Sequence, residues 1–294
     1  MQNNPFSLAD QRTYEQWREQ KLGAYPIDLS TFITTLHPNT SKYSSQIQTL
    51  QQYCSQYNFA LYRFDDSHEV TKAQLHQLAY DLGLSTIHTN LCADEDSLSA
   101  ITQTKHEGQH DYIPYTDKAL SWHTDGYYHP PEQMIQGMLL HCMQPALQGG
   151  ESQWLDHEIA YILLRDENPA YITALMHPEV LMIPENNLKG AIIRPTSLGS
   201  VFSVFNNKLH MRYSARQRNI KWRNDKITLE AVEYLKQLWA TNNSPYILNY
   251  TLKAGEGLIC NNILHNRSAF IDSNEQGKQR LLYRGRYLQR VSNL

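Results

Sequence analysis

From about residue 120 onward, the chain consists of short β-like runs separated by Gly, Pro and Asn turns, and this pattern limits the fold more than any other feature. Such runs, without a helix after each one, predict an antiparallel sandwich or barrel. Two helical stretches interrupt the runs, and we expect the first to break near Pro169. The runs are residues 134–143, 191–194, 201–205, 246–252, 258–261 and 280–291, and the helical stretches are 156–176 and 227–239.

The first 90 residues are predicted to be mainly helical. Ser7 can cap a helix that extends to about Lys21, and two more helices are expected over 42–57 and 71–82, the latter ending at Gly83. One short strand is expected over 59–64, and residues 85–118 are polar and irregular. Because there is no repeat and no linker, we expect one domain over 1–294, with a mainly helical part (1–90) and a β core with helical insertions (111–294).

Composition excludes several classes of protein. The 294 residues carry a net charge of −3 with no long run of like charge, so we expect neither nucleic acid nor a membrane as a partner. There is no signal-like N-terminus and no apolar stretch of about 18 residues. Four cysteines lie far apart without a CxxC pair, which argues against a zinc ribbon or a disulfide framework and predicts a cytoplasmic location. A homo-oligomer stays possible.

A first candidate for metal binding is the pair His123 and Asp125, at the expected end of a strand. Residues i and i+2 of a strand share a face, so this imidazole and carboxylate can hold one side of a metal ion. An HxD pair alone arises often by chance. A β-like run further along delivers His265 to a polar turn, as a third ligand requires. Two imidazoles and one carboxylate form the facial triad that leaves open positions on non-haem Fe(II).

A basic strand follows His265. Strand alternation over 278–290 puts Arg280, Arg284 and further basic residues on one face, and Leu281, Tyr283 and Tyr287 on the other. Several like charges cannot face an apolar core unpaired, so the arginine face looks to solvent or to a polar cavity. If helices cover the opposite face, Arg280 points inward, where its guanidinium can bind a carboxylate bidentately.

The motif formed by the HTD run 123–125, His265 and Arg280, in this order and spacing, resembles that of the Fe(II)/2-oxoglutarate-dependent oxygenases of the TauD/TfdA (taurine dioxygenase-like) family. The resemblance extends over residues 115–125 (YTDKALSWHTD), 129–131 (HPP), 139–142 (LLHC) and 149–152 (GGES), and the middle block is also similar to the γ-butyrobetaine hydroxylase branch. It covers about 111–160 and 255–290 well, and the first hundred residues only loosely.

The resemblance implies a double-stranded β-helix (jelly roll) with helices outside one sheet. It assigns Fe(II) to His123, Asp125 and His265, and it assigns the distal carboxylate of the cosubstrate 2-oxoglutarate to Arg280 with a hydroxyl contact from Ser152. It also implies O2 as co-reactant, release of succinate and CO2, and oxidation of a C–H bond in a small molecule.

Two substrate classes stay open. Arg284 matches a position where family members hold a substrate anion, which favours an anionic or zwitterionic molecule. Tyrosines near the HxD pair could instead form an aromatic cage for a quaternary ammonium, as in a betaine hydroxylase. These tyrosines are Tyr112, Tyr115, Tyr127 and Tyr128.

Two other functions compete with this hypothesis. Residues 106–110 (HEGQH) match the HExxH of zinc proteases, but Gly108 and the lack of an apolar helical stripe argue against the helix that this motif needs. A non-catalytic relative that keeps the fold and binds metal or ligand is the other alternative. Turnover of 2-oxoglutarate would separate it from an enzyme.

Overall fold

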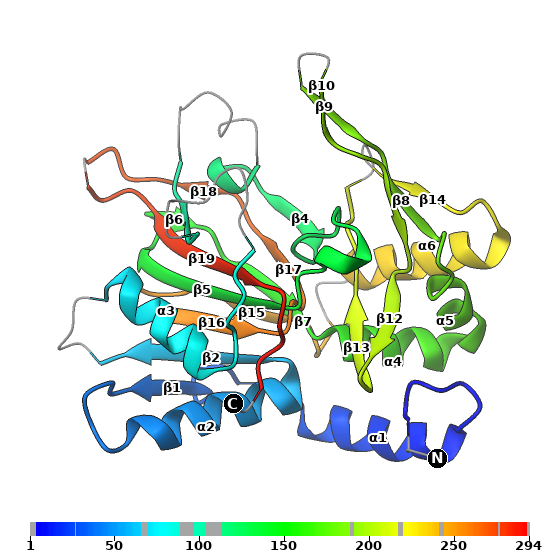
Figure 1. The fold of residues 1–294 in the computed structure, drawn as a ribbon, viewed down its shortest axis with the longest axis horizontal. Helices are drawn as coiled ribbons and strands as arrows, with labels where there is room; N and C mark the ends of the chain where they lie inside the picture. The colour runs from blue at the N-terminus through cyan, green and yellow to red at the C-terminus, as the bar shows by residue number, and fades with distance from the viewer. Residues whose placement is uncertain are drawn as a thin grey trace. The chain divides into compact units, whose positions relative to one another are not determined.

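The computed structural model describes residues 4–26, 28–65, 70–88, 97–103, 113–188, 191–216, 220–240, 244–275 and 277–292 (Figure 1). The chain divides into two compact units. Unit 1 comprises Met1–Tyr25, Ser121–Met134 and Leu155–Ile247, and unit 2 comprises Pro26–Leu120, Ile135–Trp154 and Leu248–Leu294. A single domain over the whole chain stays a prediction.

Unit 2 is built on a six-stranded sheet with the order β1-β2-β16-β5-β19-β3 (Figure 1). β1 and β2 are parallel, and the other neighbours are antiparallel. The strands are β1 (Ile33–Leu36), β2 (Phe59–Phe64), β3 (Ser99–Ile101), β5 (Gly137–Gln144), β16 (Glu256–Cys260) and β19 (Leu281–Tyr287). The last strand of the chain therefore lies inside the sheet, between β5 and β3.

Two helices, α2 (Tyr43–Tyr57) and α3 (Lys72–Asp81), pack on this sheet. Leu50 of α2 and Leu75 of α3 join one buried core with Ile259 and Tyr287 of the strands, and Tyr283 packs against it. Tyr283 and Tyr287 thus lie on the helix-covered face of β19, as the alternation predicts. Thr71 and Gln74 form a capping box at the start of α3. The helix ends as expected at Gly83, whose φ of 80° allows the left-handed turn.

A four-stranded sheet has the order β15-β7-β17-β4. Its strands are β4 (Leu120–His123), β7 (Ser152–Leu155), β15 (Leu248–Tyr250) and β17 (Leu264–Arg267), and a short pair joins β6 (Gln148–Gly149) to β18 (Phe270–Ile271). This largely antiparallel arrangement is the expected double-stranded β-helix with flanking helices.

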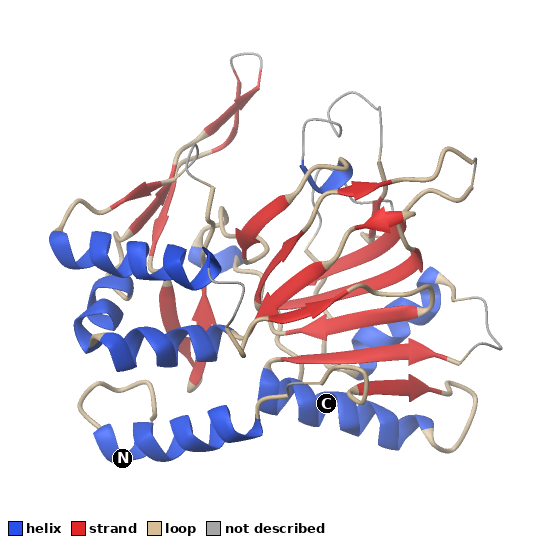
Figure 2. Ribbon diagram, turned by 180° about the vertical axis from the view of Figure 1, so that it is seen from behind, coloured by secondary structure: helices blue, strands red, loops and turns tan. Residues whose placement is uncertain are grey.

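Unit 1 combines four helices with short hairpins. The helices α4, α5 and α6 lie on one side of its strands, as both ribbon views show (Figures 1 and 2), and the hairpin β9–β10 extends away from them. The helices are α1 (Gln11–Ala24), α4 (His157–Glu167), α5 (Pro169–Leu175) and α6 (Lys226–Ala240). The strands are β8 (Leu181–Ile183), β9 (Asn186–Leu188), β10 (Ala191–Arg194), β11 (Ser197–Gly199), β12 (Phe202–Phe205), β13 (Lys208–Met211) and β14 (Lys221–Trp222). Two single turns of 3-10 helix, η1 (Ile113–Tyr115) and η2 (Pro131–Gln133), are the remaining elements of the described residues.

A buried ionic cluster fastens α1 to α4 within unit 1. Lys21 Nζ lies 2.6 Å from Asp156 Oδ2 and 2.5 Å from Glu158 Oε2. Asp156 also caps α4 by accepting a hydrogen bond from the backbone N–H of Glu158. Two carboxylates share one ammonium there, and burial raises the pKa of Asp156 to about 6 despite the nearby Lys21.

The sequence-based elements hold with a few differences. The break at Pro169 is confirmed, because Asn168 ends α4 and caps α5 with Pro169 at its first position. The first helix begins at Gln11, since Asp10 rather than Ser7 caps it by accepting from the Thr13 N–H. Many of the short strands were not expected, among them β1, β3, β7, β8 and β13. Within the described residues, no helix is both long and apolar enough to cross a membrane.

Candidate active site

His123 is the last residue of β4, and Asp125 lies in the turn that follows. Thr124 fixes the chain between them, because its N–H donates to the Tyr213 carbonyl (3.0 Å) and its hydroxyl accepts from the Tyr213 N–H (3.1 Å). Gly126, with φ of 67°, lets the chain turn away directly afterwards. His123 and Asp125 are both buried, and His123 Nε2 lies 3.7 Å from Asp125 Oδ1.

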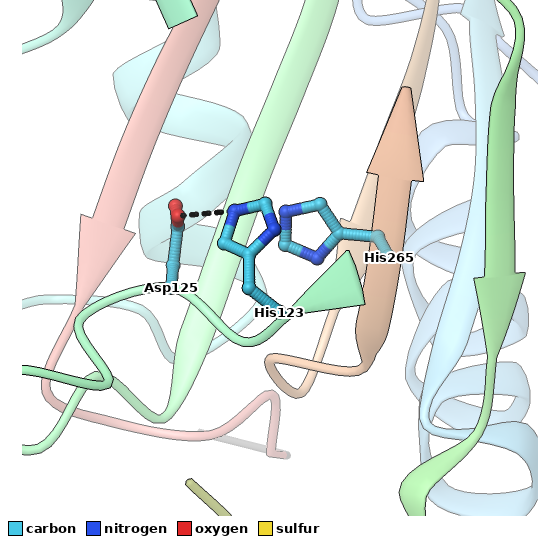
Figure 3. A group of neighbouring side chains, drawn as sticks. All are labelled: His123, Asp125 and His265. Atoms are coloured by element: carbon cyan, nitrogen blue, oxygen red, sulfur yellow. Dashed lines mark ion pairs between the residues drawn. The ribbon is translucent and has the colours of Figure 1, made fainter. Parts of the chain in front are cut away.

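His265 lies on β17, which neighbours β4 in the four-stranded sheet. One ligand atom from each of His123, Asp125 and His265 lies within 4.8 Å of the others, and Figure 3 shows the two imidazoles and the carboxylate facing one another. In the described part of the chain, this is the one group of three such side chains that is close enough to hold a metal ion.

The backbone sets which nitrogen of each imidazole faces this group. His123 Nδ1 lies 2.8 Å from the Ser121 carbonyl, and His265 Nδ1 lies 3.0 Å from the Ile263 carbonyl. A carbonyl only accepts, so Nδ1 carries the proton in both rings and Nε2 keeps a lone pair for a metal. Two imidazole nitrogens and one carboxylate oxygen are the donor set of non-haem Fe(II) sites, so these residues fit that ion.

Unit 2 contains a small cavity. Arg280 and Ser152, which the sequence analysis assigned to 2-oxoglutarate, both line it, and their role stays a prediction. The other lining residues are Cys142, Pro145, Ala146, Gly149, Gly150, Thr251, Leu252 and Leu282. Thr251 was not predicted, and its hydroxyl adds a second possible donor beside Ser152. No signal in the sequence distinguishes Thr251 from other loop threonines.

Arg280 is held in place by a backbone hydrogen bond and by contact with an aromatic ring. Its backbone N–H donates to Asp272 Oδ1 (2.7 Å), and its guanidinium carbon lies 5.0 Å from the centre of the Phe270 ring. The side chain is 7% exposed, and its guanidinium makes no hydrogen bond or ion pair with any residue that the structure describes. Burial lowers the pKa of Arg280. Arg280 is thus a buried guanidinium at the wall of a cavity, with no carboxylate of the described residues within 4.0 Å of its nitrogens, and it is suited to receive a carboxylate.

The family of the chain follows from comparison with known sequences. The sequence model of the family described as "Taurine catabolism dioxygenase TauD, TfdA family" matches residues 35–286. The chain belongs to the TauD/TfdA family. It is thus a dioxygenase with Fe(II) and 2-oxoglutarate as cofactors and O2 as co-reactant, as the motif predicted. The similarity to the γ-butyrobetaine hydroxylase branch stays a prediction. No curated protein matches the chain.

Several solved structures share the TauD/TfdA fold of the chain at low sequence identity. An asparagine oxygenase in complex with Fe(II), 2S,3S-3-hydroxyasparagine and succinate is 13% identical (TM-score 0.59, covering 87% of this chain and 93% of that one). The non-haem iron oxygenase OrfP with Fe, succinate and (3S)-hydroxy-L-Arg is 16% identical (TM-score 0.60, 84% and 81%). A putative α-ketoglutarate-dependent taurine dioxygenase from Burkholderia xenovorans is also 16% identical (TM-score 0.54, 83% and 80%).

The residues predicted to bind the substrate of this TauD/TfdA protein lie on several different elements. The Tyr127 ring centre is 6.5 Å from that of His123, and the Tyr128 ring is 5.3 Å from Tyr127. Tyr115 is buried in η1, and Arg284 lies on β19 opposite Leu140, partly buried. Tyr112 and the HExxH-like segment 106–110 lie outside the described residues.

Proposed function

We propose that this TauD/TfdA dioxygenase oxidises a C–H bond of a small anionic or zwitterionic molecule and releases succinate and CO2. The observation that supports assigning this reaction to particular residues is the convergence of His123, Asp125 and His265 within 4.8 Å, with Nδ1 of both imidazoles directed at a backbone carbonyl. Fe(II), bound there with 2-oxoglutarate and O2, supplies the oxidising power that breaks the C–H bond.

The residues of the chain bind and orient the reactants. The Arg280 guanidinium would bind the distal carboxylate of 2-oxoglutarate, and the Ser152 hydroxyl would donate a further hydrogen bond to it. Apolar side chains such as Leu252 and Leu282 line the same cavity and keep water from competing for these donors. Removing one charged hydrogen bond of this kind is expected to cost about 1.5–3 kcal/mol of binding.

The anionic substrate class is favoured over a betaine by the surroundings of Tyr128. The guanidinium carbon of Arg194 lies 5.7 Å from the centre of the Tyr128 ring. An aromatic cage attracts a quaternary ammonium through the negative faces of its rings. Here a permanent cation already lies over one of those faces and would repel a second cation.

We further propose a cytoplasmic location, on the same ground as the sequence analysis: the described cysteines Cys54, Cys142 and Cys260 are buried and form no disulfide bond with one another. Burial raises the pKa of Cys142 to about 12, which keeps this thiol protonated and unreactive. The proposed partner is a small-molecule substrate.

An anaerobic titration tests the proposed reaction class. Metal-free protein receives Fe(II) and then 2-oxoglutarate, and we expect the weak visible charge-transfer band of an iron-chelated keto acid. His265→Ala should abolish iron binding and the band, whereas the control His76→Ala, on the surface of α3, should keep both. Bound iron without the band in the wild type would reject the oxygenase and favour a non-catalytic metal-binding relative.

A further inference from the structure

We infer that Arg194 and Arg212 of unit 1 form a binding site for the carboxylate or sulfonate group of the substrate, with Arg194 in direct contact and Arg212 reinforcing its charge. The assignment of this site to the substrate rests on the proposed function. The binding of a small organic anion does not, and it can be tested alone.

Arg194, at the end of β10, is held by two backbone carbonyls. Its Nη2 donates to the Pro184 carbonyl (2.6 Å), and its Nη1 donates to the Pro195 carbonyl (3.0 Å). Its guanidinium lies over the Tyr128 ring. These contacts fix the direction of the guanidinium, and no carboxylate of the described residues forms an ion pair with it. The side chain is only partly buried, so an anion in solution can reach it.

Arg212 lies just after β13 and is 8% exposed. Its Nη1 donates to the Leu181 carbonyl (3.0 Å), and its Nη2 donates to the Ser197 hydroxyl (3.0 Å). That hydroxyl donates in turn to the carbonyl of His129 (3.2 Å). Arg212 is therefore connected through Ser197 to the turn that carries Tyr127 and Tyr128.

The two guanidiniums create an uncompensated positive charge. Among the residues that the structure describes, no carboxylate lies within 4.0 Å of either one. Burial, and next the positive charge of Arg194, lower the pKa of Arg212 to about 10. Carbonyl oxygens satisfy the N–H donors, but as neutral dipoles they do not neutralise a buried cation. A bound anion would do so, and this is the physical reason to expect one here.

This positive charge is connected by contacts to a metal ligand of the site. The Tyr127 ring touches the His123 ring, Tyr128 packs on Tyr127, and Arg194 lies on Tyr128. A small molecule whose anionic group binds Arg194 would therefore extend along the two tyrosines toward His123. An ammonium group would be repelled by both arginines, so the site selects anions over cations.

Binding of simple anions to the whole protein tests the inference. Metal-free protein is titrated with sodium methanesulfonate and with sodium acetate, and acetamide serves as the neutral probe. Side-chain Nε–H signals of arginine are followed by NMR, with the Arg194 signal assigned by its loss in Arg194→Gln. We expect a saturable shift of the Arg194 signal and of the Tyr128 ring signals with both anions, and none with acetamide. In Arg194→Gln, the dissociation constant read from Tyr128 should rise at least about 10-fold.

The control variant is Arg223→Gln, which removes an exposed arginine whose Nε lies 3.4 Å from Asp225 Oδ2. It should leave the anion titration unchanged. No saturable shift of Arg194, or an equal response of Arg223, would overturn the inference. The iron titration separates the two hypotheses: the charge-transfer band without an Arg194 response rejects the anion site alone, and the reverse result rejects the oxygenase alone.

Discussion

The two imidazoles that we propose as metal ligands are oriented in the same way, by the carbonyl two residues earlier in their own segment. His123 uses Ser121, and His265 uses Ile263. Each ring is therefore set locally, by a hydrogen bond that needs no distant partner, and only the approach of the two segments depends on the fold. Such preorganisation reduces the conformational entropy lost when a metal ion binds.

Arg280→Gln is the matching test for the cosubstrate. The variant keeps a polar side chain but loses the charge, so we expect the dissociation constant of 2-oxoglutarate to rise roughly 10- to 100-fold while iron affinity stays unchanged. The intensity of the charge-transfer band during a 2-oxoglutarate titration measures this. Arg63→Gln, at an exposed position on β2, is the control. Unchanged 2-oxoglutarate affinity in Arg280→Gln would reject the assignment.

Individual candidate site residues could be predicted from the sequence wherever a short motif determines their relative positions. The HxD motif pointed to His123 and Asp125, although Asp125 lies in the turn after β4 and not in the strand, and strand alternation predicted the face of Arg280, which directly precedes β19. Thr251 and Arg194 could not be predicted in this way. Their neighbours come from segments that are distant in the sequence, and nothing local distinguishes them from other polar residues.

Among the elements, β2 and β16 show how closely one strand can depend on its neighbour. Gly257 pairs with Tyr62, and a Cβ at Gly257 would lie 2.2–2.4 Å from atoms of the Tyr62 ring. That ring is fully buried, and its hydroxyl lies 3.2 Å from His141 Nδ1. The glycine thus makes room for an aromatic side chain that crosses the strand.

Gly257→Ala should therefore destabilise the protein, by roughly 1–3 kcal/mol, because Tyr62 must move from its packed position. The same substitution at Gly23 in α1, where a Cβ meets nothing within 4 Å, should stabilise it by up to about 1 kcal/mol. Urea denaturation of both variants measures the two effects. Equal effects would show that the contact with Tyr62 is not the cause.

The ends of helices were predicted correctly where capping residues, proline or glycine determine them. Asn168 and Pro169 fix the break between α4 and α5, and Thr71 and Gly83 bound α3. β1 and β3 are four and three residues long, and a run of this length does not by itself distinguish a strand from a loop. Both are stabilised by pairing with strands that are distant in the sequence, β2 and β19 respectively.

For the whole molecule, the buried cluster of Lys21, Asp156 and Glu158 links stability to pH. The pKa of Asp156 is raised from 3.8 to about 6 in the folded protein, so between these values the folded state holds a proton that the unfolded state has lost. The contribution of this group is therefore fully present below about pH 4 and is lost as the pH rises through about 6, roughly 3 kcal/mol at most.

Asp156→Asn tests this linkage, because asparagine still caps α4 but does not titrate. The difference in unfolding free energy between wild type and variant should change steadily from pH 4 to 6.5, with the wild type losing stability relative to the variant as the pH rises. Chemical denaturation at a series of pH values measures it, with the exposed Glu179→Gln as control. A difference that is independent of pH would show that Asp156 is already ionised at pH 4.

The position of β19 between β5 and β3 also bears on biosynthesis. In its sheet, β3 has β19 as its one neighbour, and β19 ends only at Tyr287. While the ribosome is still translating the middle of the chain, β3 has nothing to pair with, and one edge of β5 stays open. The sheet of unit 2 therefore closes only after β19 has been translated, and a nascent chain stalled before this point would expose strand edges to chaperones.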